Sequence, residues 1–133
     1  MPELEQIVYG SVATGRTDSL LNAATILAES QRNNGRDGLT GALAAHEGRY
    51  VQVLEGTPAA LDNLLRRLAT DPRHRDIEIY DRAPIGARRF AGWSMANARI
   101  TPALAAVLAR LMGETPPSPE RLVALLTEAA AAD

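Results

Sequence analysis

The sequence has no cysteine and only two histidines among its 133 residues. The absence of thiols excludes disulfides, thiolate zinc sites, iron–sulfur clusters and cysteine nucleophiles. Two histidines alone argue against a transition-metal site, so we expect no metal. No stretch approaches the roughly eighteen apolar residues of a membrane span, and no apolar run follows the acidic N-terminus. We therefore expect a cytoplasmic protein that does not bind the membrane.

An excess of one charge is also missing. The 14 basic residues are balanced by 16 acidic residues, so no overall field attracts nucleic acid phosphates. Hydrophobic residues at 46% and charged residues at 23% are near the averages for soluble globular chains. The chain is long enough for one ordinary core. We expect one folding unit that does not bind nucleic acid.

The first half of the chain alternates short apolar runs with one helical pattern. The run Leu4–Ser11 predicts a strand. From Asp18, which can cap a first turn, leucine and alanine recur at helical spacing, and Asn33–Gly35 supplies the helix stop. Leu39–Ala45 and Arg49–Leu54 then predict a hairpin with a glycine-containing turn.

The second half begins with Thr57-Pro58, a capping residue followed by proline at the first helical position. This helix ends before two strand candidates, Ile77–Asp81 and Trp93–Ile100. Two further helices open at Thr101-Pro102, with Gly113 as the stop, and at Ser118-Pro119.

The order β-α-β-β-α-β-β predicts an α+β fold with a ferredoxin-like sheet. Two helices should lie on one face of the sheet, and the C-terminal helices should cover the other. We divide the chain into a sheet region, residues 1–100, and a helical extension, residues 101–133, that packs on the sheet or mediates oligomerisation.

The sequence lacks Gly-rich phosphate loops, paired-histidine metal motifs and nucleophile elbows, but polar residues occur at unusual places. Gln52 interrupts an apolar strand, where a buried amide without partners costs about 1–3 kcal/mol, so it either faces solvent or meets a polar group. Tyr9 is either a core tyrosine with its hydroxyl at the edge or a functional phenol. Asn33 and Asn34 are either helix-stop residues or ligands. The pattern leaves these alternatives open.

Several blocks nevertheless resemble, in order from Leu4 to Ala98, the signatures of the BLUF family of blue-light sensors that use flavin adenine dinucleotide (FAD). They are Ile7–Ser11, Ser30–Asn34, Leu39–Leu43, Tyr50–Gly56, Asp71–His74 and Arg89–Met95. With only two helices predicted after them, the chain resembles the short, single-domain type of BLUF protein.

The resemblance implies roles for individual residues. Tyr9 is the electron and proton donor to the excited flavin, and Gln52 is the amide between the phenol and the ring. The block Trp93–Met95 matches the strand that passes the signal outward, and the sequence leaves open whether Trp93 or Met95 lies next to the flavin.

Asparagines in the first helix would hold the polar edge of the flavin ring, aliphatic residues of both helices would contact its faces, and three polar residues would lie near its ribityl and phosphate end. The implied cofactor-binding residues are Ile26, Ser30, Asn33, Asn34, Gln52, Arg67, Leu68, Asp71 and His74. Among these, Arg67, Asp71 and His74 occupy positions that are by default solvated surface.

We therefore expect a non-enzymatic photoreceptor and flavoprotein that binds FAD noncovalently, signals to a downstream partner protein and forms a homo-oligomer. The alternative is a flavin-free, ferredoxin-like interaction module that has lost photoactivity. A small flavin-dependent redox enzyme has less support, because no substrate acid, base or second cofactor site is visible.

Overall fold

A computed structural model describes residues 3–13, 20–71, 74–98, 100–114 and 117–131, with the side chains of 13, 20–27, 74, 97 and 131 left undescribed. The described elements follow the predicted order, and their bounds are listed next. They are β1 (Leu4–Ala13), α1 (Leu20–Asp37), β2 (Thr40–His46), β3 (Arg49–Gly56), α2 (Pro58–Ala69), β4 (His74–Ile85), β5 (Ala96–Asn97), α3 (Pro102–Met112) and α4 (Pro119–Ala131). The predicted cap at Asp18 lies outside the described residues.

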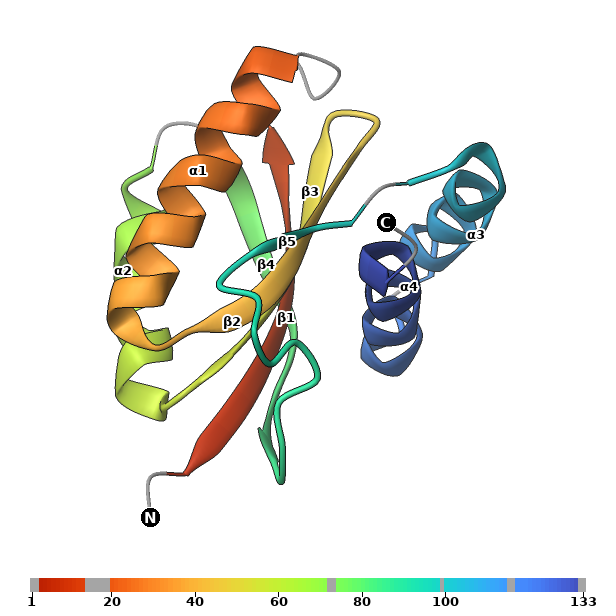
Figure 1. The fold of residues 1–133 in the computed structure, drawn as a ribbon. Coiled ribbons are helices and arrows are strands. Elements are labelled where there is room, and N and C mark those ends of the chain that lie inside the picture. The colour runs from red at the N-terminus through yellow and green to blue at the C-terminus, as the bar shows by residue number, and fades with distance from the viewer. Residues whose placement is uncertain (1–2, 14–19, 72–73, 99, 115–116, 132–133) are drawn as a thin grey trace.

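The strands form one five-stranded sheet in the order β4-β1-β3-β2-β5. The first four strands in this order pair antiparallel, and β5 pairs parallel to β2. Helices α1 and α2 lie on one face of the sheet, and α3 and α4 lie on the other (Figure 1). The predicted α+β, ferredoxin-like architecture is confirmed.

Alternation along the strands divides the core between the two faces. On β1, Ile7 and Tyr9 belong to a cluster with residues of α2, while Val8 belongs to a second cluster with residues of α3 and α4. The same alternation on β3 places Leu54 in the first cluster and Val53 in the second. The C-terminal helices therefore share a core with the sheet.

The predicted end of the first helix is wrong. Helix α1 continues through Asn33, Asn34 and Gly35 to Asp37, and Gly38 follows with φ +72°. The N–H of Leu39 donates to the carbonyl of Asn34 at 2.8 Å, the bond expected two residues beyond a helix that ends in a left-handed glycine. Gly38 ends the helix, so both asparagines have helical backbone and side chains free for other contacts.

The other predicted signals that the structure describes act where expected. The hydroxyls of Thr57, Thr101 and Ser118 accept hydrogen bonds from N–H groups three residues later, at the starts of α2, α3 and α4. Glu47 and Gly48 both have positive φ, as a tight hairpin turn requires.

Two strand predictions need correction. Strand β4 is longer than the expected Ile77–Asp81. In contrast, the expected strand Trp93–Ile100 is reduced to the two residues of β5. The chain before β5 turns instead, since Gly92 has φ +91° and the Trp93 N–H donates to the carbonyl of Phe90 at 3.0 Å.

Candidate functional site

Two polar residues that the sequence singled out are neighbours in the centre of the sheet. Tyr9 on β1 is paired with Gln52 on β3, and Gln52 is paired with Leu43 on β2. Tyr9 is 1% exposed and Gln52 is 4% exposed. A solvent-facing Gln52 and a Tyr9 hydroxyl at the edge of the core are therefore both wrong. The sheet buries a phenol and an amide on adjacent strands.

The Tyr9 hydroxyl is a buried donor that makes no hydrogen bond of normal geometry to any described residue. Burial raises the pKa of Tyr9 well above its usual value, the Asp71 carboxylate raises this pKa further, and the Gln52 amide lowers it. The phenol is therefore protonated at neutral pH. It is close enough to Gln52 and Asp71 to respond to both.

A cleft of about 480 Å³ opens between α1 and α2 on this face of the sheet. This volume is in the range of cofactor pockets. The lining residues are Glu29, Ser30, Asn33, Asn34, Leu64, Arg67, Leu68 and Asp71. The structure thus brings six of the nine predicted cofactor-binding residues to one cleft, while Gln52 is buried in the sheet. The side chains of the remaining two, Ile26 and His74, lie outside the described residues.

Arg67 connects the ends of the two helices that form the cleft. Its guanidinium lies 3.0 Å from the Asp37 carboxylate, and the side chain is 38% exposed. Asp37 also pairs with Arg36 at 3.0 Å, and the bond from Arg36, aided by Arg67, holds the pKa of Asp37 below its usual value. Arg67 therefore combines a place in the cleft with an ion pair at its rim.

The segment before β5 places its tryptophan and methionine in different environments. Met95 is 3% exposed and belongs to the same core cluster as Tyr9, whereas Trp93 is 40% exposed. The Trp93 ring lies 6.4 Å from the ring of Phe90 in a tilted arrangement. Methionine, not tryptophan, occupies the Tyr9 side of the core.

Two amides of α1 hold the backbone of this segment. The Asn34 amide donates to the carbonyl of Ser94 at 2.8 Å, and the Gln31 amide donates to the carbonyl of Met95 at 3.1 Å. Asn34 is 1% exposed and also lines the cleft. Asn34 therefore connects the cleft to the segment that carries Met95.

Comparison with known proteins identifies this arrangement. The family model described as "BLUF: Sensors of blue-light using FAD" matches residues 4–96. The chain belongs to the BLUF family. The BLUF region of this chain is a photosensor for blue light, and its cofactor is FAD.

Similar proteins include both long and short chains. The photoactivated adenylate cyclase subunit beta of Euglena gracilis is 35% identical over 96 residues, which is 71% of this chain and 11% of that protein. The chain thus spans about a tenth of the curated relatives that it matches. Among solved structures, the BLUF protein BlrB in its dark state is 36% identical with a TM-score of 0.78, covering 99% of this chain and 98% of BlrB. Klebsiella pneumoniae BlrP1 with FMN and cyclic diGMP is 31% identical with a TM-score of 0.69, covering 94% of this chain and 34% of BlrP1.

The residues present fit the flavin of a BLUF protein. The cleft between α1 and α2 has the apolar side chains of Leu64 and Leu68 on one side and the amides of Asn33 and Asn34 on the other. An isoalloxazine ring has apolar faces and a polar edge, so both kinds of lining are needed. The unpartnered hydroxyl of Tyr9 supplies a donor beneath the same helices.

Sequence reasoning missed two residues that the BLUF segment depends on. Gln31 lies inside a quoted block, but its helical position gave no sign of a contact with Met95, 64 residues away. Glu55 is a charged residue in an apolar strand, which is a signal that could have been used, and it is completely buried.

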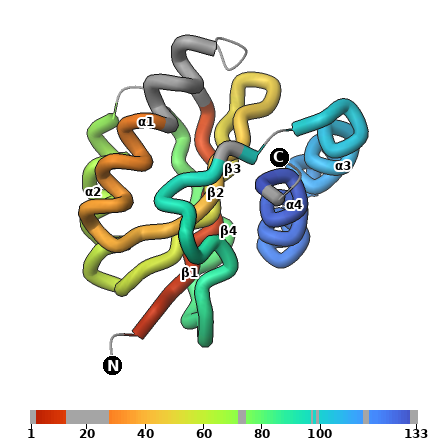
Figure 2. Tube along the Cα trace, in the orientation of Figure 1, coloured from red at the N-terminus to blue at the C-terminus, as the bar shows by residue number. Residues whose placement is uncertain are grey.

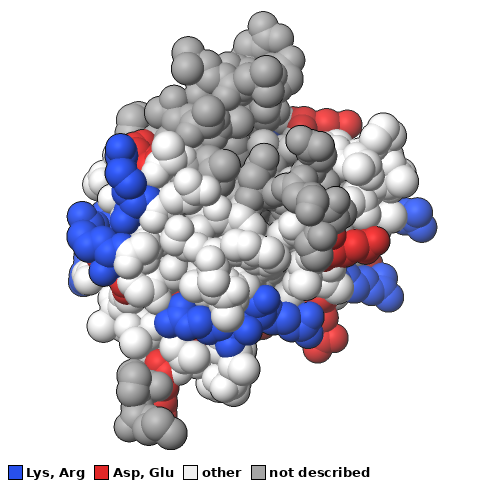
Figure 3. Space-filling model, viewed as in Figure 1, with Lys and Arg blue, Asp and Glu red and all other residues white. Residues whose placement is uncertain are grey.

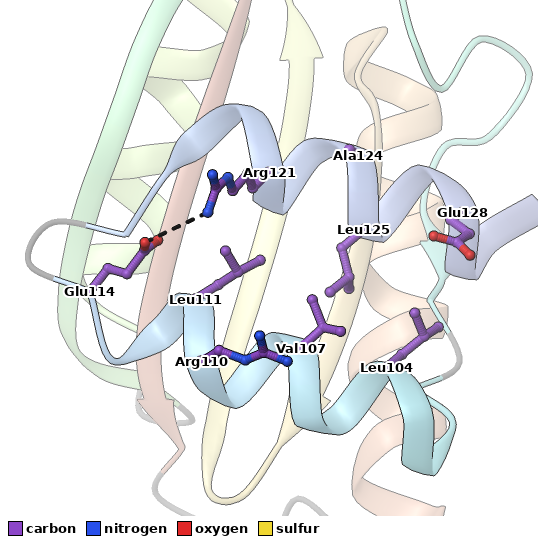
Figure 4. Close-up of a pocket in the computed structure, with 9 residues that line it drawn as sticks. All are labelled: Leu104, Val107, Arg110, Leu111, Glu114, Arg121, Ala124, Leu125 and Glu128. Atoms are coloured by element: carbon purple, nitrogen blue, oxygen red, sulfur yellow. Dashed lines mark ion pairs between the residues drawn. The ribbon is translucent and has the colours of Figure 1, made fainter.

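A second cavity lies far from the flavin cleft, on the opposite side of the sheet. It is a groove of about 380 Å³ between α3 and α4, lined by leucines, the 41% exposed Val107 and charged residues of both signs (Figure 4). At one end, Arg121 and Glu114 approach within 3.9 Å. In the space-filling view, basic side chains gather at the left edge and in a band across the lower part of the face, acidic side chains lie mostly on the right, and uncharged residues fill the centre (Figure 3).

None of the helices in the described ranges is long and apolar enough to cross a membrane. Within the same ranges, no group of three or more metal-ligating side chains comes together.

Proposed function

We propose that Tyr9 and Gln52 carry the light response of this BLUF chain. The observation that supports this proposal is the burial of both side chains on paired positions of β1 and β3, with the Tyr9 hydroxyl left without an acceptor among the described residues. A buried donor without a partner is costly unless a bound group or a functional need explains it. Here a bound flavin would explain it, together with the functional need for a phenol beside the Gln52 amide.

FAD supplies absorption of blue light and an excited ring that attracts an electron. With FAD bound, Tyr9 would be the residue that supplies an electron and its phenolic proton and later recovers both, so the protein would undergo no net oxidation. Gln52 has a donor and an acceptor on one amide, so it can reverse its hydrogen bonds during this exchange. The reversed amide is the switched state, and no covalent bond to the cofactor is made.

Other residues position the cofactor. Asn34, with Asn33 beside it, would hold the polar edge of the ring, and Leu68 would contact one face. We extend the same proposal to Ile26 for the other face, and to Arg67, Asp71 and His74 for the ribityl and phosphate end. Ser30 lines the same cleft next to these contacts.

We further propose that the signal leaves by contact with another protein rather than by catalysis in this chain. The Euglena relatives are subunits of photoactivated adenylate cyclases, and the matched region is a small part of each. In this chain, residues 1–100 would act as the sensor and residues 101–133 as the output region. A homo-oligomer in the cytoplasm completes this proposal.

Absorption spectroscopy tests the central proposal. The purified protein should be yellow or become yellow with added FAD, and blue light should produce a small, reversible red shift of the flavin band. A protein that stays colourless after incubation with excess FAD would refute flavin binding. A flavin-loaded protein with no red shift would refute the photochemical role of Tyr9 and Gln52.

A further inference from the structure

Glu55 is a fully buried carboxylate with four hydrogen-bond donors around it. One oxygen, Oε2, accepts from the backbone N–H of Arg89 at 2.8 Å and from the Gln6 amide at 3.1 Å. The other, Oε1, accepts from the backbone N–H of Phe90 at 3.0 Å and from the Thr40 hydroxyl at 3.1 Å. Both oxygens are therefore used to hold other parts of the chain.

The charge state of this group suits its partners. An ionised carboxylate only accepts hydrogen bonds, so it can face two backbone N–H groups at once. A glutamine of the same shape would direct an N–H₂ group at one of these donors. Burial of a carboxylate is unfavourable unless its oxygens are hydrogen-bonded, and here the bonds come from β1 and β2, the two neighbours of β3, and from the β4–β5 connection. The arrangement therefore selects glutamate at position 55.

Glu55 lies on the opposite face of the sheet from Tyr9 and Gln52. On β3, Gln52 and Leu54 point to the flavin side, so Glu55 points to the side of α3 and α4. Glu55 has no contact with the flavin cleft that the structure describes. What it holds is the start of the connection between β4 and β5.

This connection loops from the end of β4 to the edge of the sheet beside α1 (Figure 2). Near its start, Phe90 is 0% exposed and belongs to the core cluster beneath α3 and α4. Near its end, the carbonyls of Ser94 and Met95 accept hydrogen bonds from the α1 amides. The connection therefore has one anchor on each face of the sheet.

We propose that Glu55 is the positioning residue that fixes the Arg89–Phe90 end of this connection, so that a change at the Asn34–Ser94 contact moves Phe90 and reaches α3 and α4. This inference rests on the proposed function, because it assumes that the flavin site is the origin of the signal. Without the carboxylate, this part of the loop would keep, among the described residues, only the bonds of the Arg88 guanidinium to the Thr40 hydroxyl at 2.9 Å and to the Glu55 carbonyl at 3.1 Å. The loosened loop would then absorb the change. Light would still be sensed, but the C-terminal helices would not respond.

The test compares amide hydrogen exchange of the full-length, FAD-loaded protein in darkness and under continuous blue light, measured by NMR at each residue. The variant is Glu55→Gln, and the matched control is Glu78→Gln, the same substitution at an exposed site on β4. The flavin red shift is recorded on every sample.

In Glu55→Gln, we expect the red shift to keep its size, because the carboxylate is on the other face. Of the Arg89 and Phe90 N–H groups, at least the one that faces the new N–H₂ group should exchange about ten- to a hundredfold faster in darkness, the range for losing a hydrogen bond to a charged group. The difference in exchange rate between light and darkness in residues 102–131 should fall to less than about half of its wild-type size. General destabilisation would instead raise exchange throughout the chain in both conditions. Glu78→Gln should match the wild type.

If Glu55→Gln does not fold, Gln6→Leu takes its place, since it removes one donor to Oε2 and leaves the charge, whereas Thr40→Val would also remove an acceptor of the Arg88 guanidinium. The same changes should then appear at smaller size. An unchanged light-induced difference in residues 102–131, or unchanged exchange at Arg89 and Phe90, overturns the role of Glu55. A wild-type protein with a normal red shift and no exchange difference in these helices also overturns it. A wild-type, FAD-loaded protein that shows no red shift would instead refute the proposed function.

Discussion

The substitution Tyr9→Phe tests the site through stability as well as through light. The Tyr9 hydroxyl is buried and has no partner of normal geometry among the described residues. Leaving such a donor unsatisfied costs about 1–3 kcal/mol. Phenylalanine keeps the ring and removes the cost, so the flavin-free variant should be more stable than the flavin-free wild type by about 1–3 kcal/mol.

Urea unfolding measures this difference. With an m-value of about 2 kcal/mol per molar, a gain of about 2 kcal/mol moves the midpoint by about 1 M. Tyr80 supplies a matched control, because its hydroxyl is also buried without a described partner, but on the face beneath α3 and α4. Tyr80→Phe should therefore also raise stability.

The two variants should differ once FAD is added. In the wild type, bound flavin and Gln52 give the Tyr9 hydroxyl partners, so the advantage of Tyr9→Phe should shrink, while that of Tyr80→Phe should persist. Tyr9→Phe should retain FAD but lose the red shift, and Tyr80→Phe should keep it. If the flavin-free Tyr9→Phe protein were less stable than the flavin-free wild type, the claim that the Tyr9 hydroxyl lacks a partner would be refuted. A normal red shift in this variant would require another electron donor, for which Trp93 is the only tryptophan in the chain.

The pH dependence of stability follows from the same hydroxyl. The folded pKa of Tyr9 is raised by burial above the usual value of about 10, at which the unfolded tyrosine ionises. Ionisation of Tyr9 therefore leaves the free energy of unfolding unchanged below about pH 10 and lowers it as the pH rises further, because the unfolded chain then releases protons more readily. Unfolding measured between pH 8 and 11 should show a smaller loss for Tyr9→Phe than for the wild type. Equal losses would contradict the raised pKa.

Three further changes test the switch, the C-terminal cover and the sheet. Gln52→Leu should bind FAD and lose the red shift, because leucine can neither donate nor accept a hydrogen bond; a normal reversible shift would exclude the amide as the switch. Truncation after Ile100 should uncover the apolar face beneath α3 and α4 and cause aggregation or a changed oligomeric state, whereas a soluble, monomeric, photoactive fragment in light scattering would contradict this. Gly10→Ala should destabilise the protein by about 1–3 kcal/mol, because the new methyl group would overlap the Tyr80 ring. In thermal unfolding, the double variant Gly10→Ala with Tyr80→Leu should recover part of this loss. Equal losses of stability in the single and double variants would count against the contact.

Local signals were sufficient for most of the fold. Thr57-Pro58 and Thr101-Pro102 mark helix starts because a cap and a proline act within one turn, whatever the chain does elsewhere. Short apolar runs, and alternation in Ile77–Asp81, likewise indicated the strands, although the expected strand Trp93–Ile100 is reduced to β5. The blocks quoted for the BLUF family also lie in the sequence itself, and the family match over residues 4–96 confirms them.

Signals that compete locally were decided by tertiary structure. Both Asn33–Gly35 and Gly38 could end helix α1. The helix ends at Gly38, because the Asn34 side chain bonds to the Ser94 carbonyl, 60 residues away, instead of capping the helix. The strand expected at Trp93–Ile100 is shortened for a related reason, since its backbone turns and bonds to α1 and β2.

The sequence by itself determined the order of elements, the capping residues and the identity of Tyr9 and Gln52 as unusual polar residues, because these depend on neighbours within a few positions. Only the tertiary structure decided that Gln52 is buried beside Tyr9, that Met95 and not Trp93 joins their core, and that Glu55 anchors the β4–β5 connection. Each of these depends on which strands are adjacent and which helix covers which face. Contacts between residues tens of positions apart are set by packing of the whole sheet, which no local pattern contains.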